Sequence, residues 1–285
     1  MVDLLPFLVS GLGVGAVYAL SGVGLVVLYR SSGVLNFSFG ALGAIGAYVA
    51  WSILDHEWPQ ALAWAGGILT AMMLSLGYGR LLAPRLSHRD PTIRSIGTLG
   101  FALIVMGFTE WYWGEQPRRL ILPTDGDALE FGDVRLTYTR LLGLALAVAM
   151  MAAVGLLLSK TRIGLKMRSL ANDRELSALL GVRVLQVDTV AWVLSGLFAG
   201  VCGLLLANIV RLQATLLTFL VIPAFAAAIL GRLNSLPITV AAGVLIGVFE
   251  ALAITVPGFA PYRTAVPFLI ALAAIVFFRN TTRQA

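Results

Sequence analysis

Residues 13–49 read GVGAVYALSGVGLVVLYRSSGVLNFSFGALGAIGAYV, and this stretch decides the fold class. One apolar run ends near Arg30, and a second apolar run follows it. About 20 apolar residues are enough to cross a bilayer core of ~30 Å as a helix, because an α-helix rises ~1.5 Å per residue. The stretch therefore predicts two membrane helices. The second helix opens with Asn36, Ser38 and Gly40, where membrane helices usually carry Leu or Val.

The composition extends this prediction to the whole chain. Of its 285 residues, 59% are hydrophobic and 12% are charged, and the mean hydropathy is +0.91. Soluble domains carry about 25% charged residues, so the chain is predicted to be an all-α integral membrane protein. The alternating pattern of an outer-membrane barrel is absent from the sequence. We predict a polytopic bundle of about nine spans, within a range of eight to ten. The spans are 5–28, 33–54, 60–82, 96–113, 140–159, 186–207, 216–231, 236–256 and 262–278.

The basic residues predict the orientation of the bundle. Successive connections between spans lie on alternate sides of the membrane, and most of the 20 Lys and Arg residues fall on one of the two sides. Cytoplasmic connections are enriched in basic residues. This places the N-terminus outside and the C-terminus in the cytoplasm. Nine spans keep the basic C-terminal tail inside, and a re-entrant segment at 216–231 is the alternative. The start of the chain has no basic region and carries Asp3, so we expect no cleaved signal peptide.

Two connections in the predicted bundle are long. Residues 114–139 form an acidic external loop, and residues 160–185 form a basic cytoplasmic loop. No soluble domain is expected, so residues 1–285 are predicted to form a single transmembrane domain. The six positive charges in excess are read as loop charges of a membrane protein and not as a nucleic-acid surface.

The cytoplasmic loop contains a short amphipathic helix, LANDRELSALLG, at residues 170–181. Asn172 or Asp173 can cap its start, and Gly181 can end it. Its apolar face needs a cover, which is either the lipid headgroups or a groove of a cytoplasmic partner. That face consists of Leu176, Leu179 and Leu180.

This loop resembles a known family. Glu175 and Gly181 have the six-residue spacing of the EAA…G loop of ABC importers, with Leu176 and Ser177 in place of the two alanines. The wider stretch TRIGLKMRSLANDRELSALLGVRV resembles T-R-x-G-x-x-x-R-A-x-A…A-x-x-x-G-[IV] of permeases that import branched-chain and other hydrophobic amino acids.

The rest of the chain is similar to the same family in the same order. Residues 13–49 resemble the family opening, G-x-x-x-G-x-x-Y-A-L…N-F-x-x-G…G-A-Y. SIGTLGFALIVMG, LSGLFAGVCGLLL, AFAAAILG and GVLIGVFEAL resemble later spans. The length and the early Asn-Phe element are closer to the LivH type than to the LivM type. The sequence departs from the family at Phe39, often His there, and at residues 232–239, where the family carries Gly-Gly-x-Gly.

The resemblance implies a set of partners in the plasma (inner) membrane of a bacterium. These are two ABC ATPase subunits, a second permease subunit (LivM-like or another copy of this chain), an external solute-binding protein and membrane lipid. The chain has no G-x-x-x-x-G-K-[ST] loop, so ATP is expected on the partner subunits and no cofactor on this chain. We therefore expect a transport subunit and not an enzyme. The implied coupling helix comprises Ala171, Asp173, Glu175, Leu176, Leu179, Leu180 and Gly181.

The polar break in the second span suggests a translocation path. A zwitterionic solute needs replacement hydrogen bonds within the hydrocarbon, and the ends of a broken helix supply them. Asn36, Ser38 and Gly40 fit such a break, and Pro223 opens a second short apolar segment. The alternative is that Asn36 only ties two helices together.

Two acids inside predicted spans are singled out. Glu110 is expected at the interface beside aromatic residues. Glu250 is expected either in a functional role, as charges within a membrane often are, or in a hydrogen bond or a pair with an arginine within the bundle. Gly-x-x-x-Gly pairs are expected to bring helices close together. The single cysteine, Cys202, and two histidines suggest neither a metal site nor a catalytic site. A sugar, urea or amide permease of the same superfamily is the alternative function, and a stand-alone carrier or channel is another. The glycine pairs are Gly11–Gly15, Gly196–Gly200 and Gly243–Gly247.

Overall fold

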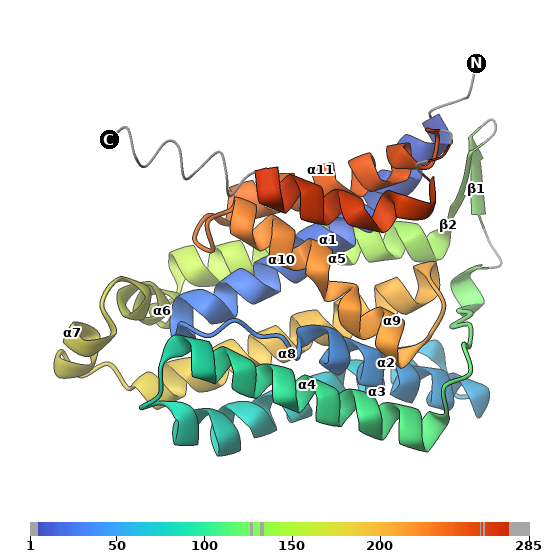
Figure 1. Cartoon of the computed structure of the whole chain (residues 1–285). Helices are drawn as coiled ribbons and strands as arrows, with labels where there is room; N and C mark the ends of the chain where they lie inside the picture. The colour runs from blue at the N-terminus through green and yellow to red at the C-terminus, as the bar shows by residue number, and fades with distance from the viewer. Residues whose placement is uncertain (1–4, 126–127, 132–133, 257, 259, 274–285) are drawn as a thin grey trace. The chain divides into compact units, whose positions relative to one another are not determined.

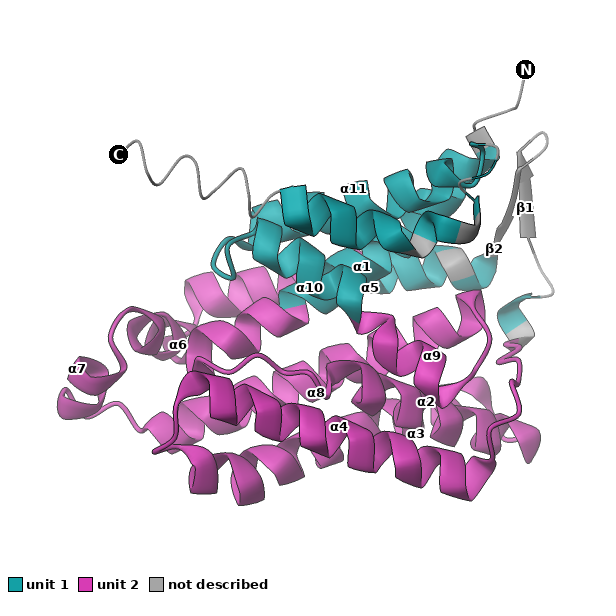
Figure 2. Cartoon of the chain, viewed as in Figure 1, with its two compact units in different colours: residues 1–23, 124–147, 222–285 teal, residues 24–123, 148–221 magenta. Residues whose placement is uncertain are grey.

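The computed structural model describes residues 5–125, 128–131, 134–256, 258 and 260–273. The chain, drawn in Figure 1, forms two compact units, which Figure 2 shows in different colours. Unit 1 comprises residues 1–23, 124–147 and 222–285, and unit 2 comprises residues 24–123 and 148–221. Because α1 and α5 each contribute to both units, the division cuts through helices and not only through loops.

The described part of the chain is almost entirely helical, as predicted. Its α-helices are α1 (Leu5–Ser32), α2 (Phe39–Asp55), α3 (Gln60–Gly77), α4 (Pro91–Trp113), α5 (Tyr138–Lys160), α6 (Arg162–Asn172), α7 (Arg174–Leu179), α8 (Val184–Ile209), α9 (Ala214–Phe219), α10 (Val221–Leu230) and α11 (Leu236–Ala253). Shorter helical turns are η1 (Tyr78–Leu82), η2 (Ala83–Leu86), η3 (Pro123–Asp125) and η4 (Ala260–Ala265).

Six helices among the described residues are long and apolar enough to cross a membrane. Each corresponds to one predicted span. They are Pro6–Ser32, Gln60–Leu86, Pro91–Trp113, Leu141–Lys160, Val184–Ile209 and Leu236–Ala253.

The remaining predicted spans differ from the helices found. The span predicted at 33–54 is not one helix, because residues 33–38 leave the helical conformation and α2 begins only at Phe39. The span predicted at 216–231 is interrupted at Leu220, between α9 and α10. Of the span predicted at 262–278, residues 266–273 are helical after η4, and residues 274–278 lie outside the described residues.

Unit 2 is built around α2, which packs against α3, α4, α8 and α9 (Figure 1). Glycines allow the close approach of these helices. A Cβ atom at Gly43 would lie 2.7 Å from the carbonyl oxygen of Ala199, and one at Gly196 would lie 2.7 Å from the Cα atom of Met72. The expected packing role of the Gly196–Gly200 pair is therefore confirmed, since small residues let helix backbones approach in a membrane.

Unit 1 uses the same device between the first part of α1 and α11. A Cβ atom at Gly11 would lie 2.8 Å from the Cα atom of Val248, and one at Gly243 would lie 2.5 Å from the Cα atom of Ala19. Both predicted glycine pairs of this unit, Gly11–Gly15 and Gly243–Gly247, thus lie where the two helices meet.

The connection predicted as an external loop, residues 114–139, contains a small β-hairpin that the sequence analysis missed. Strand β1 (Ala128–Phe131) pairs with β2 (Val134–Thr137) in antiparallel fashion, with Ala128 opposite Thr137 and Phe131 opposite Val134. The all-α prediction is corrected to this extent. A strand of four residues carries too few positions for a reliable alternation of apolar and polar residues.

Candidate functional site

The break before α2 is an irregular segment in which several backbone polar groups bind side chains of α4. Gly33 has φ +68°, a conformation that suits glycine, and it ends α1. The N–H of Leu35 donates to Ser95 Oγ at 3.1 Å, and the N–H of Phe37 donates to Thr98 Oγ1 at 3.0 Å. The Thr98 hydroxyl donates in turn to the carbonyl of Leu35 at 3.0 Å. Side chains of α4 thus replace the lost helical hydrogen bonds, as burial within a membrane protein requires.

Asn36 is the centre of the break and is buried. Its Nδ2 donates to Ser195 Oγ of α8 at 3.1 Å. Its Oδ1 accepts from the backbone N–H of Ser38 at 3.1 Å and from the Ser38 hydroxyl at 2.6 Å. The side chain therefore connects the start of α2 to α8, the arrangement named as the alternative to a solute contact.

The four candidate path residues do not all come together within one unit. Asn36 and Ser38 are hydrogen-bonded neighbours, and Gly40 follows in the first turn of α2. A Cβ atom at Gly40 would meet the Cα atom of Thr218 in α9 at 3.0 Å, so this glycine serves close packing. Pro223 lies in α10, within unit 1.

The predicted amphipathic helix of the 160–185 loop is present as α7 and has defined ends. Asp173 is the N-cap, because its Oδ1 accepts the N–H of Leu176 at 2.9 Å. Gly181 has φ +85° and its N–H donates to the carbonyl of Ala178, while the N–H of the next residue donates to the carbonyl of Ser177, both at 3.0 Å. This pair of bonds is a Schellman motif, so the predicted ending at Gly181 is confirmed.

The apolar face of α7 is uncovered in the chain. The exposed fractions are 52% for Leu176, 85% for Leu179 and 75% for Leu180. Ala171, Asp173 and Glu175 are exposed as well, so six of the seven predicted coupling residues, all but the turn glycine, present side chains at the surface. Helix α7 is fixed to α6 by a 2.6 Å hydrogen bond between the hydroxyls of Ser169 and Ser177.

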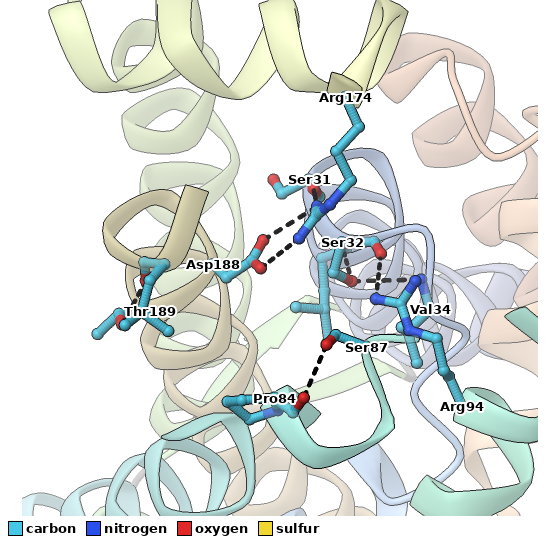
Figure 3. A network of polar contacts seen from close by, with 11 residues as sticks. Ser31, Ser32, Val34, Pro84, Ser87, Arg94, Arg174, Asp188 and Thr189 are labelled. Atoms are coloured by element: carbon cyan, nitrogen blue, oxygen red, sulfur yellow. Dashed lines mark hydrogen bonds and ion pairs between the residues drawn. The ribbon is translucent and has the colours of Figure 1, made fainter. Parts of the chain in front are cut away.

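A polar network around Arg174 was missed by sequence reasoning (Figure 3). Arg174 pairs with Asp188 of α8, with Nη2 2.5 Å from Oδ2, and donates to the carbonyl oxygen of Ser31 at 2.7 Å. Arg94 of α4 donates to the carbonyl oxygen of Ser32 at 2.8 Å. The available signal was Asp188, an acid inside the predicted span 186–207.

The two acids that were singled out have partners. Glu250 accepts a hydrogen bond from the Tyr18 hydroxyl at 2.9 Å, so the expected hydrogen bond within the bundle is confirmed. Glu110 accepts from the Thr215 hydroxyl at 2.5 Å and is half-buried, so it forms a contact between α4 and α9. Within the described residues no three His, Cys, Asp or Glu side chains are grouped to hold a metal ion.

Comparison with known proteins places the chain among transport permeases. Residues 7–275 match the family described as "Branched-chain amino acid transport system / permease component". The chain is 26% identical to the high-affinity branched-chain amino acid transport system permease protein LivH of Salmonella typhimurium, over 85% of this chain and 83% of that protein. It is also 26% identical to the corresponding protein BraD of Pseudomonas aeruginosa, over 96% of this chain and 93% of that protein.

A solved structure with a similar course of the chain is PsaBC from Streptococcus pneumoniae in complex with Fab. The TM-score is 0.48 and the identity is 14%, over 95% of this chain and 90% of that chain. The assignment rests on the family match, which includes the spans, the break before α2 and the loop that carries α7. This chain belongs to the family of branched-chain amino acid transport system permease components.

Proposed function

We propose that the chain is the membrane subunit of an ATP-driven ABC importer that moves branched-chain or related amino acids across the plasma membrane of a bacterium. The observation that carries the proposal is the family match over residues 7–275. The chain is a transport component with apolar helices that suit a bilayer. Under the proposal, hydrolysis of ATP belongs to the partner subunits.

The proposed topology places the N-terminus outside and the C-terminus in the cytoplasm, with about nine crossings. Residues 160–185 then face the cytoplasm, and residues 114–139 face the binding protein outside. The basic character of the first segment and the acidic character of the second support this orientation.

We assign energy coupling to α7 and its flanking residues. The exposed leucine face suits a groove on an ATPase subunit, a common mode of recognition for a short amphipathic helix. The cap at Asp173 and the turn at Gly181 hold the helix in shape before binding, which reduces the entropy lost on docking. The assigned residues are Ala171, Asp173, Glu175, Leu176, Leu179, Leu180 and Gly181.

The proposed translocation path includes the break before α2, with Asn36, Ser38 and Gly40, and Pro223 of α10. The Asn36–Ser195 hydrogen bond gives Asn36 a partner in the absence of solute. Direct contact with a solute requires the amide to exchange Ser195 for a carboxylate or ammonium group. A role in holding α2 and α8 together requires no such exchange.

The proposal is tested by reconstitution of the complete transporter. The chain is co-expressed with the ATPases, second permease and solute-binding protein encoded by neighbouring genes. The purified complex is reconstituted into proteoliposomes, and ATP is supplied on the side of the membrane where the ATPase subunits lie. ATP-dependent uptake of leucine, isoleucine or valine that requires the binding protein is expected. Uptake of a sugar, urea or an amide instead would contradict the assignment of amino acids as the solute and support the alternative permease of the same superfamily. Uptake without any ATPase would contradict the ABC assignment.

Coupling through α7 is tested in the same preparation. Leu179→Glu places a charge on the exposed apolar face, and co-purification of the ATPase subunits should fall at least about tenfold, the effect of losing ~1.4 kcal/mol of binding. Leu165→Glu, which changes an exposed leucine of α6 (61% exposed, against 85% for Leu179), is the control and should keep the ATPases bound. Equal retention of the ATPases by both variants would disprove the role of α7.

A further inference from the structure

The last two carbonyl groups of α1 are held by arginines from two other helices. The final carbonyls of a helix have no partner within the helix, and cations are favourable at that end. Arg174 Nη1 donates to the carbonyl oxygen of Ser31 at 2.7 Å, and Arg94 Nη2 donates to that of Ser32 at 2.8 Å. The C-terminal end of α1 is therefore attached to α7 through one arginine and to α4 through the other (Figure 3).

Arg174 has a second attachment, to Asp188 of α8. Its Nη2 lies 2.5 Å from Oδ2, and its Nη1 lies 3.3 Å from Oδ1. The side chain of Arg174 is 35% exposed and that of Asp188 is 18% exposed, so the carboxylate is better shielded from solvent than the guanidinium. A planar guanidinium can donate hydrogen bonds to a carboxylate and to a carbonyl at the same time. An ammonium group cannot do so with the same geometry.

One of the helices joined by Arg174, α8, also fixes the break before α2, and α4 is the other helix that fixes it. Asp188 and Ser195 are seven residues apart on α8, close to two helical turns, so they share a face of the helix. Ser195 accepts from Asn36. Thr98, which binds the backbone of residues 35–37, lies one turn after Arg94 on α4. The segment that leaves α1 at Ser32 is thus held by α4 at both of its ends. Helix α8 holds the far end through Ser195 and binds Arg174 at the near end through Asp188.

We propose that Arg174 is the positioning residue that transmits movement of α7 to the end of α1 and to the break at residues 33–38. The proposal rests on the proposed function, because it names the link between the coupling helix and the segment proposed to border the path. A cavity of about 230 Å³ borders Ser32, Arg94, Arg174 and Asp188, so these side chains can change position without displacing packed neighbours.

The first test compares transport with ATP hydrolysis in the reconstituted complex. Arg174→Gln should lower the number of solute molecules moved per ATP at least about fivefold, the lower end of measured coupling between sites. Arg94→Gln is the matched control, because it removes the neighbouring contact with α1 and leaves the connection to α7 in place. It should keep the wild-type ratio. Equal ratios in the two variants would overturn the proposal.

A second variant covers failure of Arg174→Gln to assemble. Arg174→Lys keeps the charge and loses the paired N–H groups, so its ratio of solute moved to ATP hydrolysed should fall below the wild-type ratio. A wild-type ratio in Arg174→Lys would also overturn the proposal.

The second test needs no transport and uses the purified full-length chain. Asp173→Ala removes the cap of α7. The amide hydrogens of Leu35 and Phe37 should then exchange at least about threefold faster, because local unfolding of α7 is coupled through Arg174 to opening of the break. In an Arg174→Gln background the same change should have no effect on these amides. An equal response in both backgrounds would overturn the link. Absence of uptake by the wild-type complex would instead contradict the proposed function, and the exchange result would still decide the role of Arg174.

Discussion

Replacement of Asn36 by alanine removes three buried hydrogen bonds at one point. The lost partners are Ser195 Oγ, the Ser38 N–H and the Ser38 hydroxyl. A typical hydrogen bond contributes about 0.5–1.5 kcal/mol, and a buried group left without a partner costs about 1–3 kcal/mol. Both residues that lose Asn36 are buried, so Asn36→Ala should lower the free energy of unfolding by about 3 kcal/mol.

The assay is reversible unfolding of the purified chain in mixed detergent micelles, followed by circular dichroism. Ser195→Ala is the matched control, because it removes only the contact with Nδ2 and should cost about 1 kcal/mol. The double variant should cost no more than about 0.5 kcal/mol beyond Asn36→Ala, since the shared bond is already lost. A free energy of unfolding for Asn36→Ala within about 0.5 kcal/mol of the wild type would refute the reasoning.

The same two variants separate the two roles considered for Asn36. If its amide contacts solute, Asn36→Ala should lower uptake per assembled transporter by about tenfold, while Ser195→Ala leaves uptake near the wild-type value. If Asn36 only ties α2 to α8, both variants should lower uptake in proportion to their loss of stability. Unchanged uptake and unchanged ligand-stimulated ATPase activity in Asn36→Ala would remove this residue from the proposed path.

Three further predictions concern packing, the turn after α7 and topology. Gly196→Val should destabilise the chain by about 1–3 kcal/mol because its Cβ would meet Met72, whereas Gly155→Ala, with open space around it, should be neutral in the same unfolding assay. Gly181→Ala should weaken retention of the ATPase subunits about fivefold because φ +85° costs an L-residue about 1 kcal/mol, and Gly181→Asn should weaken it less. In a background with Cys202→Ala, the Glu115→Cys variant should react with an impermeant thiol reagent added outside intact cells, and the Lys166→Cys variant should not. The reverse labelling pattern would contradict the proposed orientation.

The sequence was sufficient for features that arise from local chemistry. Apolar runs long enough to cross a bilayer predicted six of the long helices, because a membrane span must satisfy its own backbone hydrogen bonds. The ends of α7 were predicted for a similar reason. Asp173 caps the N–H three residues onward and Gly181 supplies a positive φ, so both act within one turn of their own position.

The contacts of the candidate site depend on residues that are far apart in sequence. Asn36 and Ser195 are 159 residues apart, and Arg174 and Ser31 are 143 residues apart. Neither pairing follows from hydropathy, since the sequence names no partner for Asn36 and Arg174 is one basic residue among several in a loop. The sequence alone determined that the chain forms membrane helices and where α7 is capped. Only the tertiary structure decided which helices border the break at residues 33–38, because buried polar groups take the partners that helix packing brings within hydrogen-bonding distance.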